Sequence, residues 1–158
     1  MRRTVTIERT FKDTTPEEVW ELWTTAEGIE SWWGPDGFKV KVEKLELRPG
    51  GALLYVMIAV DADKVAFMKS AGMPVSVETR AYFTEVTPPR RLAFTHIVNF
   101  VPGVEPYETA TIVELHGHGD ETHLVLTLEV MHDEEWTQRA VSGWENELGK
   151  LAKAIAAR

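Results

Sequence analysis

Four side chains that bind divalent metals stand close together near residue 120. They are His116, His118, Asp120 and His123, and imidazole and carboxylate groups are common ligands of zinc and related ions. The intervening glycines make this segment a flexible turn, which cannot hold metal ligands in a fixed geometry. We therefore expect a solvated hairpin turn and no metal site.

His96 is the histidine best placed for chemistry in the interior. On the alternation of Leu92, Phe94, His96 and Val98, it shares a strand face with apolar residues. There it would donate a hydrogen bond, or act as a general base if a carboxylate oriented its ring. The alternative, which we favour, is a histidine satisfied by a backbone carbonyl.

Two further residues are candidates for proton transfer. Glu147 lies beside the apolar stripe of a C-terminal helix, so it is either an acid/base partner or, as we favour, a rim residue with its carboxylate in water. Tyr82 would act with His96 if the protein were an enzyme. The sequence has no Gly-rich phosphate loop, nucleophile elbow or paired-carboxylate spacing, so no catalytic residue is assigned.

The element that holds Glu147 is a long helix predicted from Asp133 to Arg158. Asp133 caps its amino end, and Glu134 and Glu135 stand where the helix dipole favours negative charge. The helix needs a broad partner, because one face carries two tryptophans. That face consists of residues three or four positions apart, namely Trp136, Ala140, Trp144, Leu148, Leu151 and Ile155.

The amino-terminal segment reads as a strand followed by two short helices. The strand covers Thr4 to Phe11. A capping box then begins the first helix, with Thr15 at the cap, Pro16 at the first helical position and Glu18 three residues after the cap. The second helix is expected over Ala26 to Trp33.

The rest of the chain reads as antiparallel strands. The strand from Phe38 changes its alternation near Glu43-Lys44, which indicates a bulge. The strand Ala52–Val60 is apolar throughout, so it is either covered on both faces or packs against a second subunit in a homodimer. Further strands are expected at Val77–Val86, Leu92–Phe100, Thr109–Leu115 and His123–Met131.

The segment Asp61 to Pro74 interrupts the strands and is apolar for a loop. It carries Val65, Phe67, Met68 and Met73. A small helical lid and an irregular hairpin with its own apolar cluster explain it equally well.

Length and charge exclude several classes of protein. The 158 residues fit one domain over 1–158, and the absence of cysteine excludes disulfides and thiolate sites. The formal net charge is −8 and no basic cluster exceeds Arg90-Arg91, so nucleic acid is not an expected partner. No apolar run is long enough to span a membrane, and the amino terminus lacks a signal peptide. We expect a cytoplasmic protein.

Three stretches resemble one family in the expected order. They are Phe11–Trp33 (FKDTTPEEVWELWTTAEGIESWW), Pro88–Thr95 (PPRRLAFT) and Gly143–Ile155 (GWENELGKLAKAI). The chain resembles the START-like, or SRPBCC, superfamily, and within it the family named after the activator of the ninety-kilodalton heat-shock protein ATPase. The resemblance implies an α+β helix-grip fold, in which a curved antiparallel sheet of six to seven strands wraps around the C-terminal helix. The sequence departs from the family pattern at His96 and in a longer Asp61–Pro74 segment.

The superfamily includes binders of lipids, sterols, hormones and polyketides as well as aromatase/cyclases, so the fold does not fix the function. We expect a small hydrophobic or amphipathic ligand between sheet and helix and no cofactor; catalysis stays open, and we favour binding without it. The alternatives are a cyclase/aromatase-like enzyme and a ligand-free interaction module or co-chaperone. The expected ligand-binding residues are Trp32, Phe67, Met68, Met73, Phe94, His96, Trp136, Ala140 and Trp144.

Overall fold

The computed structural model describes residues 3–34, 36–99 and 101–158. Within them, seven strands form one antiparallel sheet in the order β1-β7-β6-β5-β4-β3-β2, which makes β1 and β2 its edges. The strands are β1 (Thr4–Lys12), β2 (Phe38–Leu45), β3 (Ala52–Ala59), β4 (Ser76–Thr87), β5 (Arg91–Val98), β6 (Tyr107–His118) and β7 (Glu121–Glu129).

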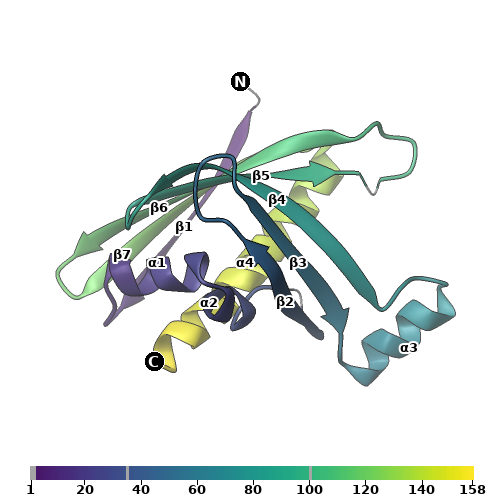
Figure 1. Cartoon of the computed structure of the whole chain (residues 1–158), viewed down its shortest axis with the longest axis horizontal. Helices are drawn as coiled ribbons and strands as arrows, with labels where there is room; N and C mark the ends of the chain where they lie inside the picture. Colours follow the sequence, from purple (N-terminus) through teal and green to yellow (C-terminus); the bar gives the residue numbers. More distant parts are fainter. Residues whose placement is uncertain (1–2, 35, 100) are drawn as a thin grey trace.

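The helices are α1 (Pro16–Thr24), α2 (Ala26–Glu30), α3 (Ala62–Ser70) and α4 (Glu134–Ala156). Figure 1 shows α4 crossing the strands obliquely, with α1 and α2 toward its C-terminal end. Residues of α1, α2 and α4 share one apolar core with one face of the sheet. We call this the inner face. The architecture is the predicted helix-grip fold, and among the described residues no helix is long and apolar enough to cross a membrane.

The first helix begins as the capping box predicts. The Thr15 hydroxyl accepts from the Glu18 backbone N–H at 3.2 Å, and the Glu18 carboxylate accepts from the Thr15 N–H at 3.2 Å. The second helix is shorter than predicted, because it ends at Glu30 rather than at Trp33. The chain leaves it through a turn that reaches Gly34, whose φ of 99° suits glycine best.

Two bulges curve the sheet. The register between β2 and β3 shifts between Val42 and Lys44, which confirms the bulge predicted there. A second shift, between Phe83 and Glu85 of β4, was not predicted. A bulge bends its strand and increases the local twist, as a sheet that wraps around a helix requires.

β3 has an inner and an outer face in spite of its uniform apolar composition. Leu53 and Tyr55 are buried, whereas Leu54, Val56 and Ile58 are half-buried. The strand lies between β2 and β4, which protects its edges but not its outer face.

The segment after β3 is helical, as one of the two alternatives predicted. Asp61 caps α3 by accepting a hydrogen bond from the Asp63 backbone N–H at 2.9 Å. Met68 is buried, while Phe67 is 64% exposed and Met73 is 50% exposed. In Figure 1, α3 lies beyond the ends of β3 and β4 and away from α4.

The two halves of α4 differ in burial. Asp133 caps the helix as predicted, since its carboxylate accepts from the Trp136 N–H at 2.8 Å. In the C-terminal half, Leu148 and Leu151 are almost completely buried. In the N-terminal half, the predicted inward residues Trp136, Ala140 and Trp144 are all half-buried. The helix therefore closes tightly on the sheet at one end and more loosely at the other.

Candidate functional site

A buried tyrosine and a histidine meet on the inner face of the sheet. The Tyr55 hydroxyl lies 3.0 Å from Nε2 of His96. Tyr55 is on β3 and His96 on β5, so the contact passes over the intervening strand β4. It does so beside Ala81, which pairs with His96 and is completely buried. A larger side chain at that position would stand between the two rings.

Tyr55 keeps its proton under ordinary conditions. Burial is the main cause that raises its pKa, and the negative charge of Glu147 raises it further. A hydrogen bond with the Thr79 side chain has the opposite, smaller effect on that pKa. The tyrosine is therefore a neutral hydroxyl that links Thr79 to His96.

His96 is neutral at physiological pH. Burial lowers the pKa of its imidazole to about 4, since the interior disfavours the charged ring. Its side chain nevertheless retains an intermediate accessible surface, unlike its neighbour Phe94, which is 1% exposed. His96 is therefore less tightly enclosed than the apolar residue two positions before it on the same strand face.

Glu147 reaches inward from α4 and holds the turn after α2. Its Oε1 accepts from the Gly34 backbone N–H at 2.8 Å, and Lys150 Nζ donates to the Gly34 carbonyl at 2.6 Å. Burial raises the pKa of Glu147, while the Gly34 hydrogen bond and the Lys150 charge lower it. The prediction of a rim position with the carboxylate in water is wrong, because the side chain is half-buried and bonded to this turn.

Aromatic rings surround these polar groups. Trp144 of α4 stacks on Trp23 of α1, with ring centroids 5.8 Å apart and planes 17° apart. The ring of Trp33 meets Tyr55 and Trp144 edge-on, at 5.2 Å and 6.2 Å. Phe94 lies 5.5 Å from His96 and 6.1 Å from Trp33. These rings belong to the hydrophobic core, and Tyr55, His96 and Glu147 are the polar groups fixed beside them.

Two indole groups in this cluster are unusual. The Nε1 atoms of Trp23 and Trp33 are buried and have no hydrogen-bond partner among the described residues. Trp32 differs, because its indole N–H donates to the Leu22 carbonyl at 2.8 Å. Buried polar groups normally have partners, so unpaired ones call for an explanation.

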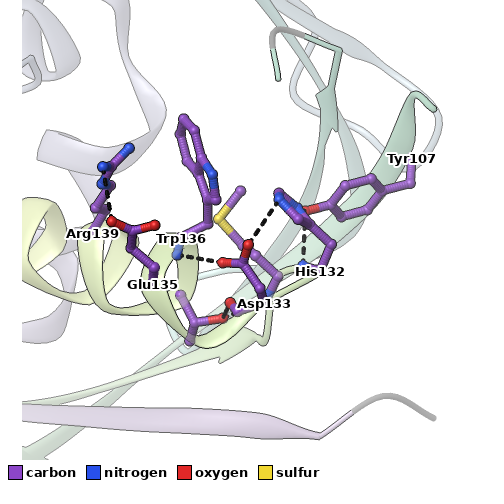
Figure 2. Close-up of polar contacts among 8 residues, drawn as sticks. Tyr107, His132, Asp133, Glu135, Trp136 and Arg139 are labelled. Carbon is purple, nitrogen blue, oxygen red and sulfur yellow. Dashed lines mark hydrogen bonds and ion pairs between the residues drawn. The ribbon is translucent and has the colours of Figure 1, made fainter. Parts of the chain in front are cut away.

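A pocket of about 250 Å³ opens at the amino end of α4, lined by Tyr107, Val130, Met131 and His132. Figure 2 shows Tyr107 and His132 in contact there: the Tyr107 hydroxyl lies 2.7 Å from Nδ1 of His132 and accepts from its backbone N–H at 3.1 Å. Tyr107 pairs with Val98 in the sheet, one step along the strand face from His96. The pocket therefore lies on the same inner face.

Trp136 forms one wall near this pocket. Its ring lies 6.0 Å from that of His132, and the Arg139 guanidinium lies 4.7 Å from its ring centroid on the other side. Arg139 is itself paired with Glu135 at 3.2 Å, as Figure 2 shows. These contacts hold the indole in place at the looser end of α4.

A larger hollow of about 530 Å³ lies elsewhere, between α1, α2 and the end of α4. It is an open surface feature whose lining includes Glu21, Thr25 and Ser31, and the Arg158 side chain pairs with Glu21 there at 3.2 Å. None of the aromatic residues of the candidate site borders it. Size alone therefore does not identify the functional site.

The structure brings together only part of the predicted ligand-binding set. Phe94, His96 and Trp144 lie in one cluster. Trp32 was expected at the entrance, but it is 1% exposed and belongs to the core. Phe67 and Met73 are exposed on and just after α3, a helix that Figure 1 shows away from α4. Met68 is buried, and Trp136 and Ala140 are half-buried on α4.

The proposed proton-transfer pair of His96 and Tyr82 is not brought together. Tyr82 follows Ala81 in β4, so it points to the outer face, where its hydroxyl accepts from Arg80 at 3.3 Å. Tyr55, which the sequence reasoning missed, takes its place. The available signal was that Tyr55 is the only hydrogen-bonding side chain within the apolar run Ala52–Val60.

Of the histidines near residue 120, His116 and His123 form a pair on the outer face of the sheet, and His118 comes just before the hairpin turn. His116 faces His123 across β6 and β7, and His123 contacts Glu8 at 2.8 Å and Thr10 at 2.9 Å. Within residues 3–34, 36–99 and 101–158 no group of three or more His, Cys, Asp or Glu could hold a metal ion.

Burial shifts the pKa values of both His96 and Tyr55. A neutral histidine with a pKa of about 4 is a weak base at neutral pH, and a tyrosine with a raised pKa is a weak acid. Both are effective hydrogen-bonding groups for a polar atom. Fold and site together define a helix-grip protein of the START-like class.

Comparison with known proteins gives the family. The family described as "Activator of Hsp90 ATPase homolog 1-like protein" matches residues 13–156, and this chain belongs to it. No curated protein matches the chain.

Several solved structures share the fold. A Chromobacterium violaceum protein is 22% identical with a TM-score of 0.78, covering 96% of each chain. A Silicibacter pomeroyi protein of the same family name is 22% identical with a TM-score of 0.75, covering 98% of this chain and 99% of that one. An Aeromonas hydrophila protein is 20% identical with a TM-score of 0.73, covering 98% and 93%. At these identities the likeness concerns the fold alone.

Proposed function

We propose that the protein binds a small hydrophobic or amphipathic molecule between the inner face of the sheet and the N-terminal half of α4. The observation that carries this proposal is His96, a neutral ring beside the aromatic cluster that keeps intermediate exposure and, among the described residues, is hydrogen-bonded through Nε2 alone. A core built only for stability would enclose such a polar ring or replace it by an apolar one.

The shape of α4 supports the same location. Its C-terminal half is sealed by Leu148 and Leu151, whereas Trp136, Ala140 and Trp144 of its N-terminal half stay half-buried, and the pocket at Tyr107 opens at that end. Large apolar surfaces that remain partly open are typical of ligand sites.

The test is the intact mass of the purified protein under native and then denaturing conditions. A captured ligand appears as a mass excess that is present in the native spectrum and lost on denaturation. Ala140→Phe should abolish the excess, because the added ring occupies the space under α4. Ser142→Phe is the matched control, since Ser142 is exposed on the same helix. Equal occupancy in both variants would contradict the proposed location.

A ligand-free interaction module is the second candidate, and one observation favours it. The outer face of β3 presents Leu54, Val56 and Ile58 half-buried, and this apolar strip suits a second copy of the chain. The same native spectrum reports the mass of the assembly. A dimer with no bound small molecule would support the module and contradict ligand binding.

A further inference from the structure

The hydrogen bond between Tyr55 and His96 determines which nitrogen of His96 carries the proton. Tyr55 is protonated and contacts both the Thr79 side chain and Nε2 of His96. A phenol O–H is a stronger donor than a neutral imidazole N–H, and an imidazole nitrogen is a stronger acceptor than a phenol oxygen, so the Tyr55 O–H donates to Nε2. The neutral imidazole then carries its proton on Nδ1. His96 therefore offers an N–H donor at its other nitrogen.

That donor is open. No hydrogen bond to Nδ1 of His96 occurs in the described part of the chain, and the side chain keeps accessible surface. A ligand acceptor that reached Nδ1 could take this hydrogen bond without displacing a protein group.

A second donor lies nearby. The Trp33 indole N–H is buried without a partner among residues 3–34, 36–99 and 101–158. Tyr55 and Phe94 each contact both the Trp33 ring and the His96 ring, with centroid distances of 5.2–6.2 Å. The two donors thus border the same pair of aromatic rings, within the span of one small molecule.

The charges and hydrogen-bonding groups around the two donors restrict the chemistry of the ligand further. Glu147 is the carboxylate nearest to this region, and its Oε1 is already bonded to Gly34 with Lys150 close by. Its negative charge, in a chain of net charge −8, disfavours an anionic ligand. The open groups are donors, so a ligand that itself only donates would leave them unpaired.

We propose that the bound molecule is an uncharged aromatic or apolar compound with a carbonyl-type oxygen that accepts hydrogen bonds from His96 Nδ1–H and the Trp33 indole N–H. This proposal rests on the proposed binding function. It adds the chemistry of the ligand's polar end: a ketone, ester or amide oxygen fits, whereas a hydrocarbon, an amine or a carboxylate does not.

A matched pair of fluorescent probes tests the proposal. Prodan is 6-propionyl-2-(dimethylamino)naphthalene, and 6-propyl-2-(dimethylamino)naphthalene is the same molecule with the carbonyl replaced by a methylene group. We expect wild-type protein to bind prodan at least about fivefold more tightly, since an unpaired buried donor costs about 1–3 kcal/mol. His96→Phe and Trp33→Phe should each reduce this preference, whereas Tyr82→Phe on the outer face should keep it.

The outcomes separate the two proposals. If both probes bind wild-type protein equally well, the carbonyl proposal is overturned and the binding function stands. If neither binds, both are overturned. A readout that needs no variant is the infrared carbonyl band of bound prodan. It should lie at lower wavenumber than in hexane, and a hexane-like band would show that the donors stay unpaired or point to aromatic faces.

Discussion

Tyr55 and His96 are joined by a 3.0 Å contact that crosses a whole strand of the sheet. The crossing depends on Ala81, which lies beside His96 on the intervening strand and has no side chain beyond Cβ. This relationship creates a polar pair within an aromatic interior.

The first prediction concerns pH. His96 titrates with a pKa of about 4 in the folded protein, against 6.5 as its ordinary value. Between these two pH values the unfolded chain binds one proton more than the folded one, so acid favours unfolding. Stability from this residue is complete above pH 6.5 and is lost toward pH 4, by up to about 3 kcal/mol at ~1.4 kcal/mol per unit.

Urea unfolding at pH 7 and pH 4.5 measures this effect. His96→Gln removes the titrating group, so the difference in unfolding free energy between the two pH values should be smaller in the variant. The same difference in both proteins would mean that His96 is solvated and not held neutral by burial.

The second prediction concerns Glu147, whose pKa burial raises. A raised carboxyl pKa contributes stability below the unfolded pKa, and this contribution is lost as the pH rises through the folded value. The Glu147→Gln variant cannot ionise at this position, so it does not lose this stability as the pH rises. Its stability relative to wild type should therefore increase from pH 4 to pH 7 in chemical denaturation. Glu145→Gln, at an exposed position two residues earlier, should show no such trend.

The third prediction compares two tryptophans. Trp32 is fully buried and hydrogen-bonded, so Trp32→Ala should cost about 3–5 kcal/mol of unfolding free energy. Trp144 is half-buried and stacks on Trp23, so Trp144→Ala should cost clearly less, about 1–3 kcal/mol. Thermal and urea unfolding give both values. A cost for Trp144 as large as that for Trp32 would mean that α4 lies closed over the site.

The fourth prediction uses adjacent residues of α3. Met68 is buried and anchors the helix, so Met68→Ala should destabilise the protein by about 2–5 kcal/mol. Phe67 is 64% exposed, so Phe67→Ala should change stability by less than about 0.5 kcal/mol. Ligand occupancy in the native mass spectrum should be the same in Phe67→Ala and wild type. Lower occupancy would restore Phe67 to the binding site.

The elements of the fold were predictable where local rules govern them. The capping box at Thr15, the Asp133 cap and the alternation change at Glu43-Lys44 each depend on nearby residues, and all appear in the structure. The second helix was predicted too long, because turn geometry at Gly34 ended it before Trp33.

The site was predictable only in part, because its contacts join distant strands. The alternation around Phe94 placed His96 on the inner face correctly. Nothing local indicates that Tyr55 reaches His96 over Ala81, or that Glu147 holds Gly34 from a distant helix. Trp32 and Trp33 are neighbours of the same type and both are buried, and only the three-dimensional packing pairs the indole N–H of Trp32 and leaves that of Trp33 unpaired among the described residues.

Crystallography under xenon pressure tests the central claim most directly, because it does not require the ligand to be known. Xenon enters apolar cavities that are otherwise vacant. The account predicts non-protein density, from xenon or from a co-purified molecule, between His96 and Trp144. Side chains in direct contact throughout that region, with neither kind of density, would contradict it.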